Sequence, residues 1–459
     1  MAFQLRDPVH NFLTLNRDEV KLMDTRAIQR LRGIRQLAMA NLVYPGAVHT
    51  RFDHSLGVAH VAGMMSRELG LENDEVHLVR LAGIVHDIGH GPFSHVSEQA
   101  LEMYADRTKL GTEQKREKIH ELVSAQIIQT DPDIIRILGR DKCREIVRLL
   151  GEGHGQPALK SIVSGPLDAD KQDYLLRDSL FCGVPYGIFD IQQMHRSLVL
   201  EGPEEEKELM IKPDGIHAVE QYILAKYYLT TNVYRHKVRL ITDQMIARAI
   251  VLGIEKDGLG ELRSLYAFDN SEDFARRYIE WDDSRFLHRF CLDAEPTRCK
   301  GMLDRLLQRR LLKRVLNART TDFKPEVSDM LPQLNKPEQT LLRSKVEAAI
   351  AEKLKELTGQ AVDPDSVIVN IFTIRSVRET SRDDEAGILV ADKGRKPFDQ
   401  ASTLLASIDK RYADEFVEVY APVEWPTEAD KNRIRRMVEV PILELIETHC
   451  GKSAEGAMK

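Results

Sequence analysis

The chain has 459 residues, of which 42% are hydrophobic and 30% are charged, a composition typical of a globular protein. Its length leaves room for two or three domains or for one elaborated core. The formal net charge of −7 argues against general affinity for nucleic acid through bulk positive charge, although a local basic patch could still bind phosphates.

The cysteines and the hydrophobic runs indicate the compartment. Five cysteines are scattered along the chain without a CxxC pair, so we expect reduced thiols and neither a disulfide framework nor a zinc knuckle. The N-terminal stretch MAFQLRDPVHNFLTL has no basic region followed by an apolar run. No stretch approaches the roughly 20 apolar residues of a membrane helix. We therefore expect a cytoplasmic protein that makes no membrane contact.

The first half of the chain is mostly helical in pattern. Residues 1–20 predict a short extended lead-in, with turn formers at Asp7-Pro8 and Asn11. Apolar residues at every third position predict an amphipathic helix from Asp24 to about Leu37. Helices are also expected over 53–69, 72–86, 121–150 and 168–180, and the charged segment 106–120 predicts an exposed connector.

The second half changes character near residue 320. Residues 195–215, HRSLVLEGPEEEKELMIKPDG, predict a β-hairpin around an acidic turn, and 216–255 and 301–318 predict helices. The later segments DSVIVNIFTIRS, EAGILVAD and EFVEVYAPVEW are β-rich, with helices expected at 336–358 and 428–449. The fold class predicted is mainly α, with a helical core and a small β-hairpin over 1–320. A smaller α+β region over 321–459 is expected to serve oligomerisation or regulation.

Three histidines and an aspartate fall within LAGIVHDIGHGPFSH, residues 81–95. His86 and His90 are four apart and would share a helix face if the helix continues to Gly89. Asp87 adds a carboxylate, and nitrogen with carboxylate ligands suits a first-row divalent ion such as Mn, Fe, Ni or Zn. An HD dipeptide alone is common by chance, but an unpaired imidazole at a buried helix end is costly. The remaining ligands are sought in two polar clusters, at His54 and Asp170.

This pattern resembles the H…HD…D metal site of the HD-domain phosphohydrolase superfamily. The motifs YPGAVHTRFDHSLGVAH, LAGIVHDIGHGPFSH, LDADKQDYLLRD and VYRHKV are similar to those of the animal sterile-alpha-motif and HD-domain deoxynucleoside triphosphate triphosphohydrolases and of their bacterial relatives. The similarity is dense over about residues 5–250 and thins toward the C-terminus. Because the chain starts almost at the catalytic core, we expect no sterile-alpha-motif domain.

The resemblance implies an HD-domain helical core that splits a dNTP into deoxynucleoside and inorganic triphosphate. The bond broken joins the α-phosphorus to the 5′ oxygen. The implied metal ligands are His54, His86, Asp87 and Asp170, holding Mn, Fe, Mg, Ni or Zn. Such an ion lowers the pKa of a bound water and polarises the α-phosphate. The groups implied to surround the triphosphate are Arg51, His90 and Lys171, with His120 as a further candidate.

A proton donor is needed for the departing oxygen. His95 fits this general acid, because an imidazole exchanges protons near neutrality. Glu98 lies three residues on and could hold the ring if the segment is helical. His120 with Glu121 forms a second histidine–carboxylate pair and is the competing candidate for the acid.

Sugar recognition is implied for residues of the third motif and one upstream glutamine. Gln36 and Asp178 correspond to the residues that bind the 3′ hydroxyl in the family. Tyr174 corresponds to the aromatic residue that packs against the 2′ carbon and leaves no room for a ribose hydroxyl. Tyr174 and Asp178 are four apart, so they share one face of a predicted helix. Tyr234 is a candidate for stacking on the base.

The animal enzymes are nucleotide-bridged tetramers, and the resemblance extends to their activator site. Asp24, Gln29 and Arg32 occupy the positions that read guanine, and their donors and acceptors match that base. The residues expected to contact the activator phosphates from neighbouring subunits are His236, Lys237, Arg309 and Lys313. We therefore expect allosteric activation by GTP or dGTP, with Mg as a possible companion ion, and a homotetramer or homodimer.

Three departures from the animal motifs matter. Lys226 and Thr230 stand where the animal enzymes carry an arginine and a histidine. Lys226 could still meet a phosphate, but as a point charge without bidentate geometry. Phe3 replaces a lysine, which weakens the case for a second activator nucleotide bridged by magnesium.

Two other classes of function stay open. Another HD enzyme, a nucleotide phosphodiesterase or an alarmone hydrolase, would share the metal ligands but need not share Tyr174 and Asp178. A nucleotide sensor or a single-strand nucleic-acid-binding module would have an idle site, yet every implied ligand and proton donor is present. Assays with dNTP against NTP would separate the first class, and metal content would separate the second.

Overall fold

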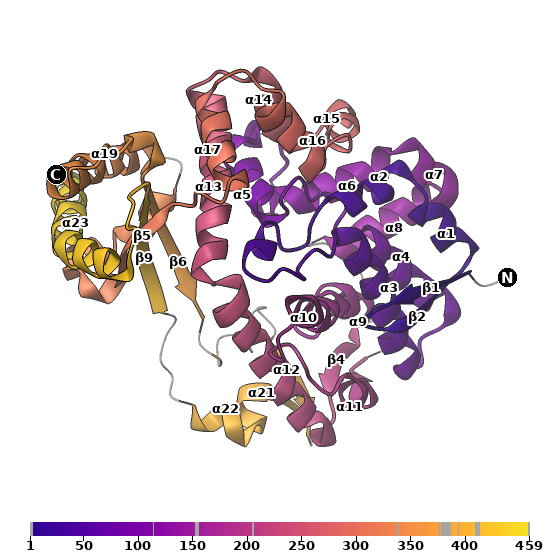
Figure 1. The fold of residues 1–459 in the computed structure, drawn as a ribbon. Coiled ribbons are helices and arrows are strands. Elements are labelled where there is room, and N and C mark those ends of the chain that lie inside the picture. Colours follow the sequence, from indigo (N-terminus) through magenta and orange to yellow (C-terminus); the bar gives the residue numbers. More distant parts are fainter. Residues whose placement is uncertain are drawn as a thin grey trace. The chain divides into compact units, whose positions relative to one another are not determined.

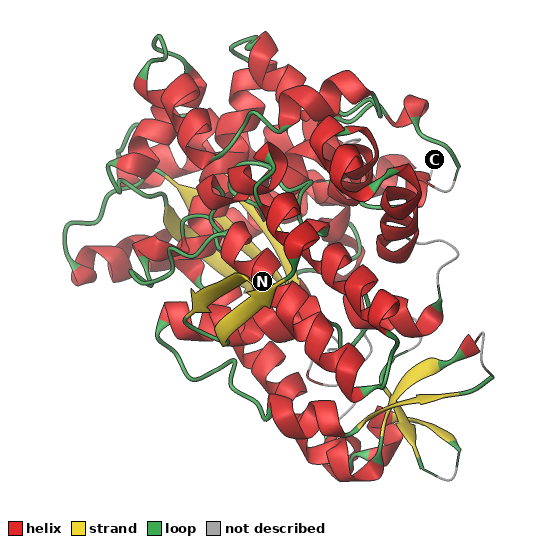
Figure 2. Ribbon diagram, turned by 90° about the vertical axis from the view of Figure 1, so that its right-hand side faces the viewer, coloured by secondary structure: helices red, strands yellow, loops and turns green. Residues whose placement is uncertain are grey.

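The computed structural model describes residues 3–112, 114–151, 156–203, 206–336, 339–375, 377, 387–392, 394–408 and 414–457. The fold is mainly helical with a few small sheets (Figures 1 and 2), which confirms the predicted class. The chain forms two compact units. Unit 1 comprises Met1–Tyr234, Gly260–Arg289 and Val377–Arg411, and unit 2 comprises Arg235–Leu259, Phe290–Ser376 and Tyr412–Lys459. No described helix combines the length and apolar character of a membrane span.

The N-terminal lead-in of unit 1 is a β-hairpin. Strands β1 (Phe3–Asp7) and β2 (Asn11–Leu15) pair antiparallel, from Phe3 opposite Leu15 to Asp7 opposite Asn11. Asn11 adopts a left-handed conformation with φ 64°, which asparagine tolerates better than most residues. Helix α1 (Arg17–Met23) follows, with Asn16 capping its first turn.

The helix predicted from Asp24 to about Leu37 is shorter than its apolar pattern indicates. Helix α2 (Arg26–Gln29) continues as the 3-10 turn η1 (Arg30–Gly33) and stops there. Ile34 is extended, and Arg35 forms a β-bridge with Thr50. A side chain at Gly33 would collide with Asp282, so the end of this helix packs closely against a distant segment of the chain. The apolar residues at every third position are nevertheless buried.

Five helices carry the residues discussed below, and most were predicted within a few residues. They are α3 (Arg51–Glu68), α4 (Asn73–Val85), α5 (His95–Tyr104), α6 (Ile119–Thr130) and α10 (Ala169–Cys182). Helix α3 packs against both α4 and α10. The connector expected over 106–120 contains the short turns η3 (Arg107–Lys109) and η4 (Gln114–Arg116).

Two predicted long helices are interrupted. The stretch 121–150 divides into α6, α7 (Pro132–Leu138) and α8 (Arg140–Leu150), because Pro132 starts a new helix and Gly139 has φ 81°. The stretch 216–255 divides into α12 (Ile216–Leu229), the π-helical turn η7 (Thr230–Tyr234) and α13 (Lys237–Glu255). Shorter helices of unit 1 are α9 (Pro157–Val163), α11 (Ile191–Arg196), α14 (Gly260–Tyr266), α15 (Glu272–Tyr278), α16 (Asp283–Leu287), α21 (Phe398–Ala401) and α22 (Thr403–Ser407).

The predicted hairpin at 195–215 is confirmed as β3 (Leu198–Glu201) and β4 (Glu208–Ile211). It is part of a four-stranded sheet in the order β3-β4-β7-β8, completed by β7 (Leu389–Ala391) and β8 (Arg395–Pro397). The β-rich segment EAGILVAD therefore supplies a strand to unit 1, as far as its residues are described.

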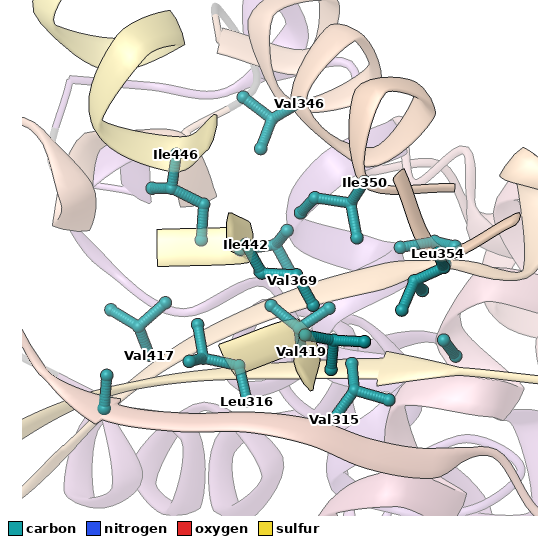
Figure 3. Packing of buried hydrophobic residues seen from close by; sticks show 14 of the residues in the cluster. Val315, Leu316, Val346, Ile350, Leu354, Val369, Val417, Val419, Ile442 and Ile446 are labelled. Atoms are coloured by element: carbon teal, nitrogen blue, oxygen red, sulfur yellow. The ribbon is translucent and has the colours of Figure 1, made fainter. Parts of the chain in front are cut away.

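Unit 2 is built on a three-stranded antiparallel sheet in the order β5-β9-β6. The strands are β5 (Lys313–Arg319), β6 (Ile368–Ile374) and β9 (Asp414–Ala421). Their apolar side chains meet those of α19 (Thr340–Thr358) and α23 (Glu428–Ala457) in one buried cluster (Figure 3). Helices α17 (Arg298–Leu307) and α18 (Pro325–Ser328) also belong to this unit. Helix α17 packs against α13.

The helix predicted over 301–318 was wrong in its second half. Helix α17 ends at Leu307, and β5 begins at Lys313. Val315 and Leu316 are fully buried in the sheet beside β9, so pairing with a strand about a hundred residues away overrides the local helical pattern. The division into regions 1–320 and 321–459 stays a prediction, because packing alone does not say which part folds independently.

Candidate active site

Four predicted metal ligands lie together in unit 1, supplied by three helices. His54 is on α3, His86 and Asp87 follow the last residue of α4, and Asp170 is in the first turn of α10. The His54 Nε2 atom lies 2.9 Å from Asp170 Oδ1 and 3.7 Å from Asp87 Oδ2. The His86 Nε2 atom lies 3.3 Å from Asp87 Oδ1 and 3.7 Å from Asp170 Oδ1. Two imidazole nitrogens and two carboxylates thus face one another.

His86 provides the test of whether this group fits a metal. Its Nδ1 lies 2.9 Å from the carbonyl of Gly83, which can only accept, so Nδ1 carries the hydrogen. Its Nε2 is buried and has no hydrogen-bond partner among the described residues. A buried nitrogen lone pair is costly unless it meets a donor or a cation. The group of His54, His86 and Asp170 could hold a metal ion, and two imidazoles with a carboxylate suit a divalent transition metal. Asp87, which approaches both histidines, could add a second carboxylate.

A second layer behind His54 was missed by the sequence reasoning. The Asp173 carboxylate lies 2.8 Å from His54 Nδ1 through Oδ2, and 2.6 Å from His10 Nε2 through Oδ1. The Arg177 guanidinium donates to both oxygens of Asp173 and, at 2.9 Å, to Asp7. A side chain at Gly57 would collide with this pair. The one available signal was that Asp173 follows Asp170 by three residues and so shares its helix face.

The charges of the group favour a cation between its ligands. Burial lowers the pKa of His54, but hydrogen bonds with Asp170 and Asp173 outweigh burial and raise that pKa to about 10. Burial opposes ionisation of Asp87, but the Arg51 guanidinium and His86 hold its pKa well below the usual range. Burial likewise opposes ionisation of Asp170, and His54 and His86 lower its pKa. The carboxylates are therefore anionic, as metal ligands must be, and a metal ion bound there would replace the proton on His54 Nε2.

Arg51 begins α3 and is buried beside the predicted metal ligands. Its Nη1 donates to Asp87 Oδ2, and its Nε donates to Ser94 Oγ at 2.8 Å. The remaining Nη2 is buried without a hydrogen-bond partner in the described part of the chain. The predicted phosphate-binding arginine therefore does lie at the site, with one donor group still to be satisfied.

His90 reaches Asp87 by a turn and not by a shared helix face. Helix α4 ends at Val85, and His90 lies in the turn that follows. The backbone N–H of His90 donates to the Asp87 carbonyl. The His90 Nε2 atom lies 3.2 Å from Asp87 Oδ1, the same oxygen that His86 approaches. Its ring stacks on His120, with centroids 4.5 Å apart. Helix α4 ends one residue before the predicted end at His86, so the two histidines do not share a helix face, yet both lie close to Asp87.

The carboxylate of Glu98 lies close to three histidines. Its Oε1 lies 2.9 Å from His95 Nδ1, 3.2 Å from His90 Nδ1 and 3.9 Å from His120 Nδ1. Both His95 and Glu98 lie in the first turn of α5, as the spacing predicted. Burial opposes ionisation of Glu98, but His95 and His120 hold its pKa well below the usual range.

His120 pairs differently from the prediction. The carboxylate that it approaches is Glu98, whereas Glu121 Oε1 lies 3.6 Å from Lys118 Nζ. Burial lowers the pKa of His120 to about 4 and raises that of Glu121. The side chain of His95 is about half exposed at 55%, in contrast to 12% for His120.

The predicted sugar-binding residues gather around Asp178. The Tyr234 hydroxyl donates to Asp178 Oδ2 at 2.6 Å, and His49 Nε2 lies 2.7 Å from Oδ1. The ring of Tyr174 meets Tyr234 edge-on, with centroids 6.2 Å apart. The backbone N–H of Gln36 donates to the His49 carbonyl at 3.1 Å, and the side-chain Oε1 of Gln36 is buried without a partner among the described residues. His49 was not foreseen.

The two predicted phosphate-binding lysines are less well supported. Lys171 donates from Nζ to Asp168 Oδ2 at 2.6 Å and to the Gly165 carbonyl at 3.0 Å. Its ammonium group thus helps to hold the start of α10, and the phosphate contact expected of Lys171 stays a prediction. Lys226 lies in the last turn of α12, where its carbonyl accepts from the Thr230 hydroxyl at 2.8 Å.

Two of the three predicted guanine-reading residues contact each other in unit 1. Arg32 Nε donates to Gln29 Oε1 at 2.9 Å and its guanidinium lies over the Phe52 ring, 3.5 Å from the centroid. Asp24 caps α1 and is exposed. The predicted activator-phosphate residues all lie in unit 2 and comprise His236 and Lys237 at the start of α13, Arg309 after α17 and Lys313 at the start of β5.

The helical fold and the His–Asp ligand group define an HD-domain phosphohydrolase, a class that uses a metal ion. The chain belongs to this family: the HD domain matches residues 51–176 and the HD associated region matches residues 189–444. A hypothetical protein from Aquifex aeolicus shares the fold, with a TM-score of 0.66 at 23% identity over 98% of this chain and 100% of that one.

Three sequence relatives are informative. An uncharacterized protein of Methanocaldococcus jannaschii is 27% identical over 445 residues, which span 96% of this chain and 84% of the relative. The YwfO protein of Bacillus subtilis is 29% identical over 68% of this chain and 71% of its own length. The human deoxynucleoside triphosphate triphosphohydrolase SAMHD1 is 28% identical over 364 residues, 72% of this chain and 58% of the human protein.

Proposed function

We propose that the protein hydrolyses deoxynucleoside triphosphates to deoxynucleoside and inorganic triphosphate. One observation carries the proposal. Helix α10 bears Asp170, Tyr174 and Asp178 on successive turns, about 6 Å apart along the helix axis. A nucleotide whose α-phosphate lies at the metal ligands would therefore extend its sugar toward Tyr174 and the group around Asp178. The similarity to the human triphosphohydrolase points to the same substrate class.

The residues of the site match the needs of this reaction. A divalent ion held by His54, His86, Asp87 and Asp170 would polarise the α-phosphate and lower the pKa of the attacking water. Arg51 Nη2, which has no hydrogen-bond partner among the described residues, offers a charge-assisted hydrogen bond to a phosphate oxygen. Attack of the water on the α-phosphorus breaks the bond to the 5′ oxygen, and this oxygen must then take up a proton.

We assign that proton transfer to His95. Glu98 Oε1 accepts a hydrogen bond from His95 Nδ1, because a carboxylate can only accept. The His95 ring therefore presents Nε2 as the atom that delivers a proton. His120 is the weaker candidate, since burial lowers its pKa to about 4 and it would hold no second proton near neutrality. Metal binding by neighbouring histidines would leave His95 the most exposed imidazole of the group.

The test is product analysis by anion exchange after incubation of each of the four dNTPs with Mn²⁺ or Mg²⁺. Release of inorganic triphosphate from dNTPs but not from NTPs is the expected result. Asp87→Ala should lose both metal content and activity, whereas Asp133→Ala, an exposed acid on α7, should keep both. Triphosphate release by an Asp87→Ala protein with full metal content would refute the assignment. Hydrolysis only of a phosphodiester or an alarmone would place the chain in another HD enzyme class.

We also propose that GTP or dGTP activates a tetramer through Asp24, Gln29 and Arg32. The contact of Arg32 with Gln29 and its stacking on Phe52 would present a pre-oriented guanidinium to the O6 and N7 acceptors of guanine. Addition of dGTP should accelerate hydrolysis of the other dNTPs and shift the protein to tetramers in light scattering. Asp24→Ala should abolish both effects, and Asp18→Ala on the same helix should abolish neither.

A further inference from the structure

The turn that precedes His95 is strained. Phe93 and Ser94 both have positive φ, at 62° and 54°, and Ser94 has ψ −115°. Side chains disfavour this part of conformational space, and the Ser94 combination is one that glycine normally occupies. Two consecutive residues of this kind persist only where the surroundings hold them, and such strain clusters at active sites.

A short helix far away in sequence supplies the holding contacts. The Phe93 amide donates to Asp283 Oδ1 at 2.7 Å, and the Arg35 amide donates to Asp283 Oδ2 at 3.1 Å. The Phe93 ring meets Phe286 edge-on, with centroids 5.2 Å apart. Asp283 and Phe286 both lie on α16 and are buried. One helix therefore fixes Phe93 through both its backbone and its side chain.

The hydroxyl of Ser94 connects this turn to the metal ligands. Ser94 Oγ donates to the Arg35 carbonyl at 2.6 Å and accepts from Arg51 Nε at 2.8 Å. Arg51 in turn donates to Asp87. A displacement of the turn would therefore move both the residue that follows it, His95, and the guanidinium that orients Asp87.

The start of the same loop, at residues 88–90, is also linked to the segment that contains α16. The buried guanidinium of Arg30 donates to the Ile88 carbonyl at 3.1 Å and to the Trp281 carbonyl at 2.8 Å. It also donates to the carbonyl of His90. The segment 281–286 thus holds the histidine-bearing loop at two places. Arg30 links it to Ile88 and His90, and Asp283 and Phe286 contact Phe93.

We propose that α16 is a positioning element of the active site, in which Asp283 and Phe286 hold the strained Phe93–Ser94 turn. The turn sets His95 against Glu98 and Arg51 against Asp87. Asp283 and Phe286 act through other residues and do not touch the substrate. The catalytic consequence rests on the proposed function, whereas the structural part concerns the conformation of residues 93–95 alone.

The experiment compares Asp283→Asn and Asp283→Ala with Asp273→Ala in the full-length, metal-loaded protein. Asp273 is the matched control, an exposed acid on the neighbouring helix α15 that pairs with Arg276 and Arg277. Two quantities are measured for each variant. One is hydrogen exchange resolved to the Phe93 amide and to the first turn of α5, and the other is kcat and KM with metal content determined alongside.

For both Asp283 variants, we expect faster exchange of the Phe93 amide. We also expect kcat to fall about tenfold to a hundredfold, the loss that a misplacement on the order of 1 Å causes, with KM and metal content near the wild-type values. Phe286→Leu, which keeps Asp283, covers the case in which an Asp283 variant does not fold, and it should show the same pattern more weakly. Asp273→Ala should change nothing.

Faster exchange with unchanged kcat would overturn the positioning role, and unchanged exchange would overturn the holding role of Asp283. If the wild-type protein releases no triphosphate from dNTPs, the proposed function fails, but the exchange measurement still decides whether α16 holds the turn.

Discussion

His54 and Asp173 are joined by a 2.8 Å hydrogen bond between the imidazole Nδ1 and the carboxylate Oδ2. Because a carboxylate only accepts, Nδ1 carries the hydrogen, and Nε2 is the nitrogen directed at Asp170 and Asp87. Asp173 is itself held by the buried Arg177 guanidinium. The orientation of His54, a proposed metal ligand on α3, is thus set by a residue pair on α10.

Asp173→Asn should weaken metal binding about 10- to 100-fold, the usual cost of losing the partner that orients a ligating histidine. The amide offers one acceptor oxygen where the carboxylate serves Arg177, His10 and His54 together, so thermal stability should fall as well. Chelator competition measures the affinity. Asp178→Asn on the same helix is the control, and it should keep metal affinity while raising KM. Equal affinities in the two variants would contradict the role assigned to Asp173.

Tyr174→Ala should relax discrimination between dNTP and NTP substrates. The ring occupies the space beside the sugar in the proposed pose, and removing a steric barrier of this kind changes selectivity roughly 10- to 200-fold. The ratio of kcat/KM for dATP and ATP is the measurement. Tyr174→Phe retains the ring and should retain the discrimination. If the phenylalanine and alanine variants discriminate alike, the tyrosine ring does not exclude the ribose hydroxyl.

His95→Asn should lower kcat by about 10² to 10⁴, the contribution typical of a general acid, with metal content unchanged. A substrate that releases 4-nitrophenolate needs no proton on its leaving oxygen and should lose far less activity. His217→Asn is a matched control, because His217 Nδ1 also lies 2.9 Å from a glutamate three residues on, but on an exposed surface. The same substrate-dependent loss in His120→Asn, and not in His95→Asn, would transfer the acid role to His120.

The parts of the site that were predictable from sequence are those set by spacing along a helix. His95 and Glu98 pair in one turn of α5, and Tyr174 and Asp178 lie on one face of α10. The proposed metal ligands were identified from motifs that occur in the same order as in the family, and their role stays a prediction. Their geometry was less predictable: α4 ends before His86, and a turn brings His90 to Asp87.

The parts that were not predictable depend on contacts between distant segments. Phe93 and Asp283 are 190 residues apart, and no local pattern links them. The helix expected from Asp24 ends at Gly33, where Asp282 leaves no space for a side chain. Lys171 donates from its ammonium group to Asp168, three residues earlier, a contact that was not predicted. In each case, the deciding partner is chosen by tertiary packing or by competition with a nearby charge.

Asp283 also gives a prediction for the pH dependence of stability. Burial raises the pKa of Asp283 to about 6, while the amides of Phe93 and Arg35 and the Arg35 guanidinium lower it and Asp282 raises it. The folded chain therefore binds this proton more tightly than the unfolded chain. The resulting stability is present in full below the ordinary aspartate pKa of about 4 and is lost as the pH rises through about 6.

Asp283→Asn cannot ionise, so it should lack this dependence. The free energy of unfolding of the wild-type protein, taken relative to Asp283→Asn, should increase by about 1.4 kcal/mol between pH 7.5 and pH 5. Denaturant titrations of both proteins at each pH provide the difference, in which the other titrating groups cancel. A difference that stays constant over this range would mean that Asp283 is already fully ionised at pH 5. A carboxylate of that kind would hold the Phe93 amide at every pH in the range, and the loop that carries His95 would be insensitive to mild acid.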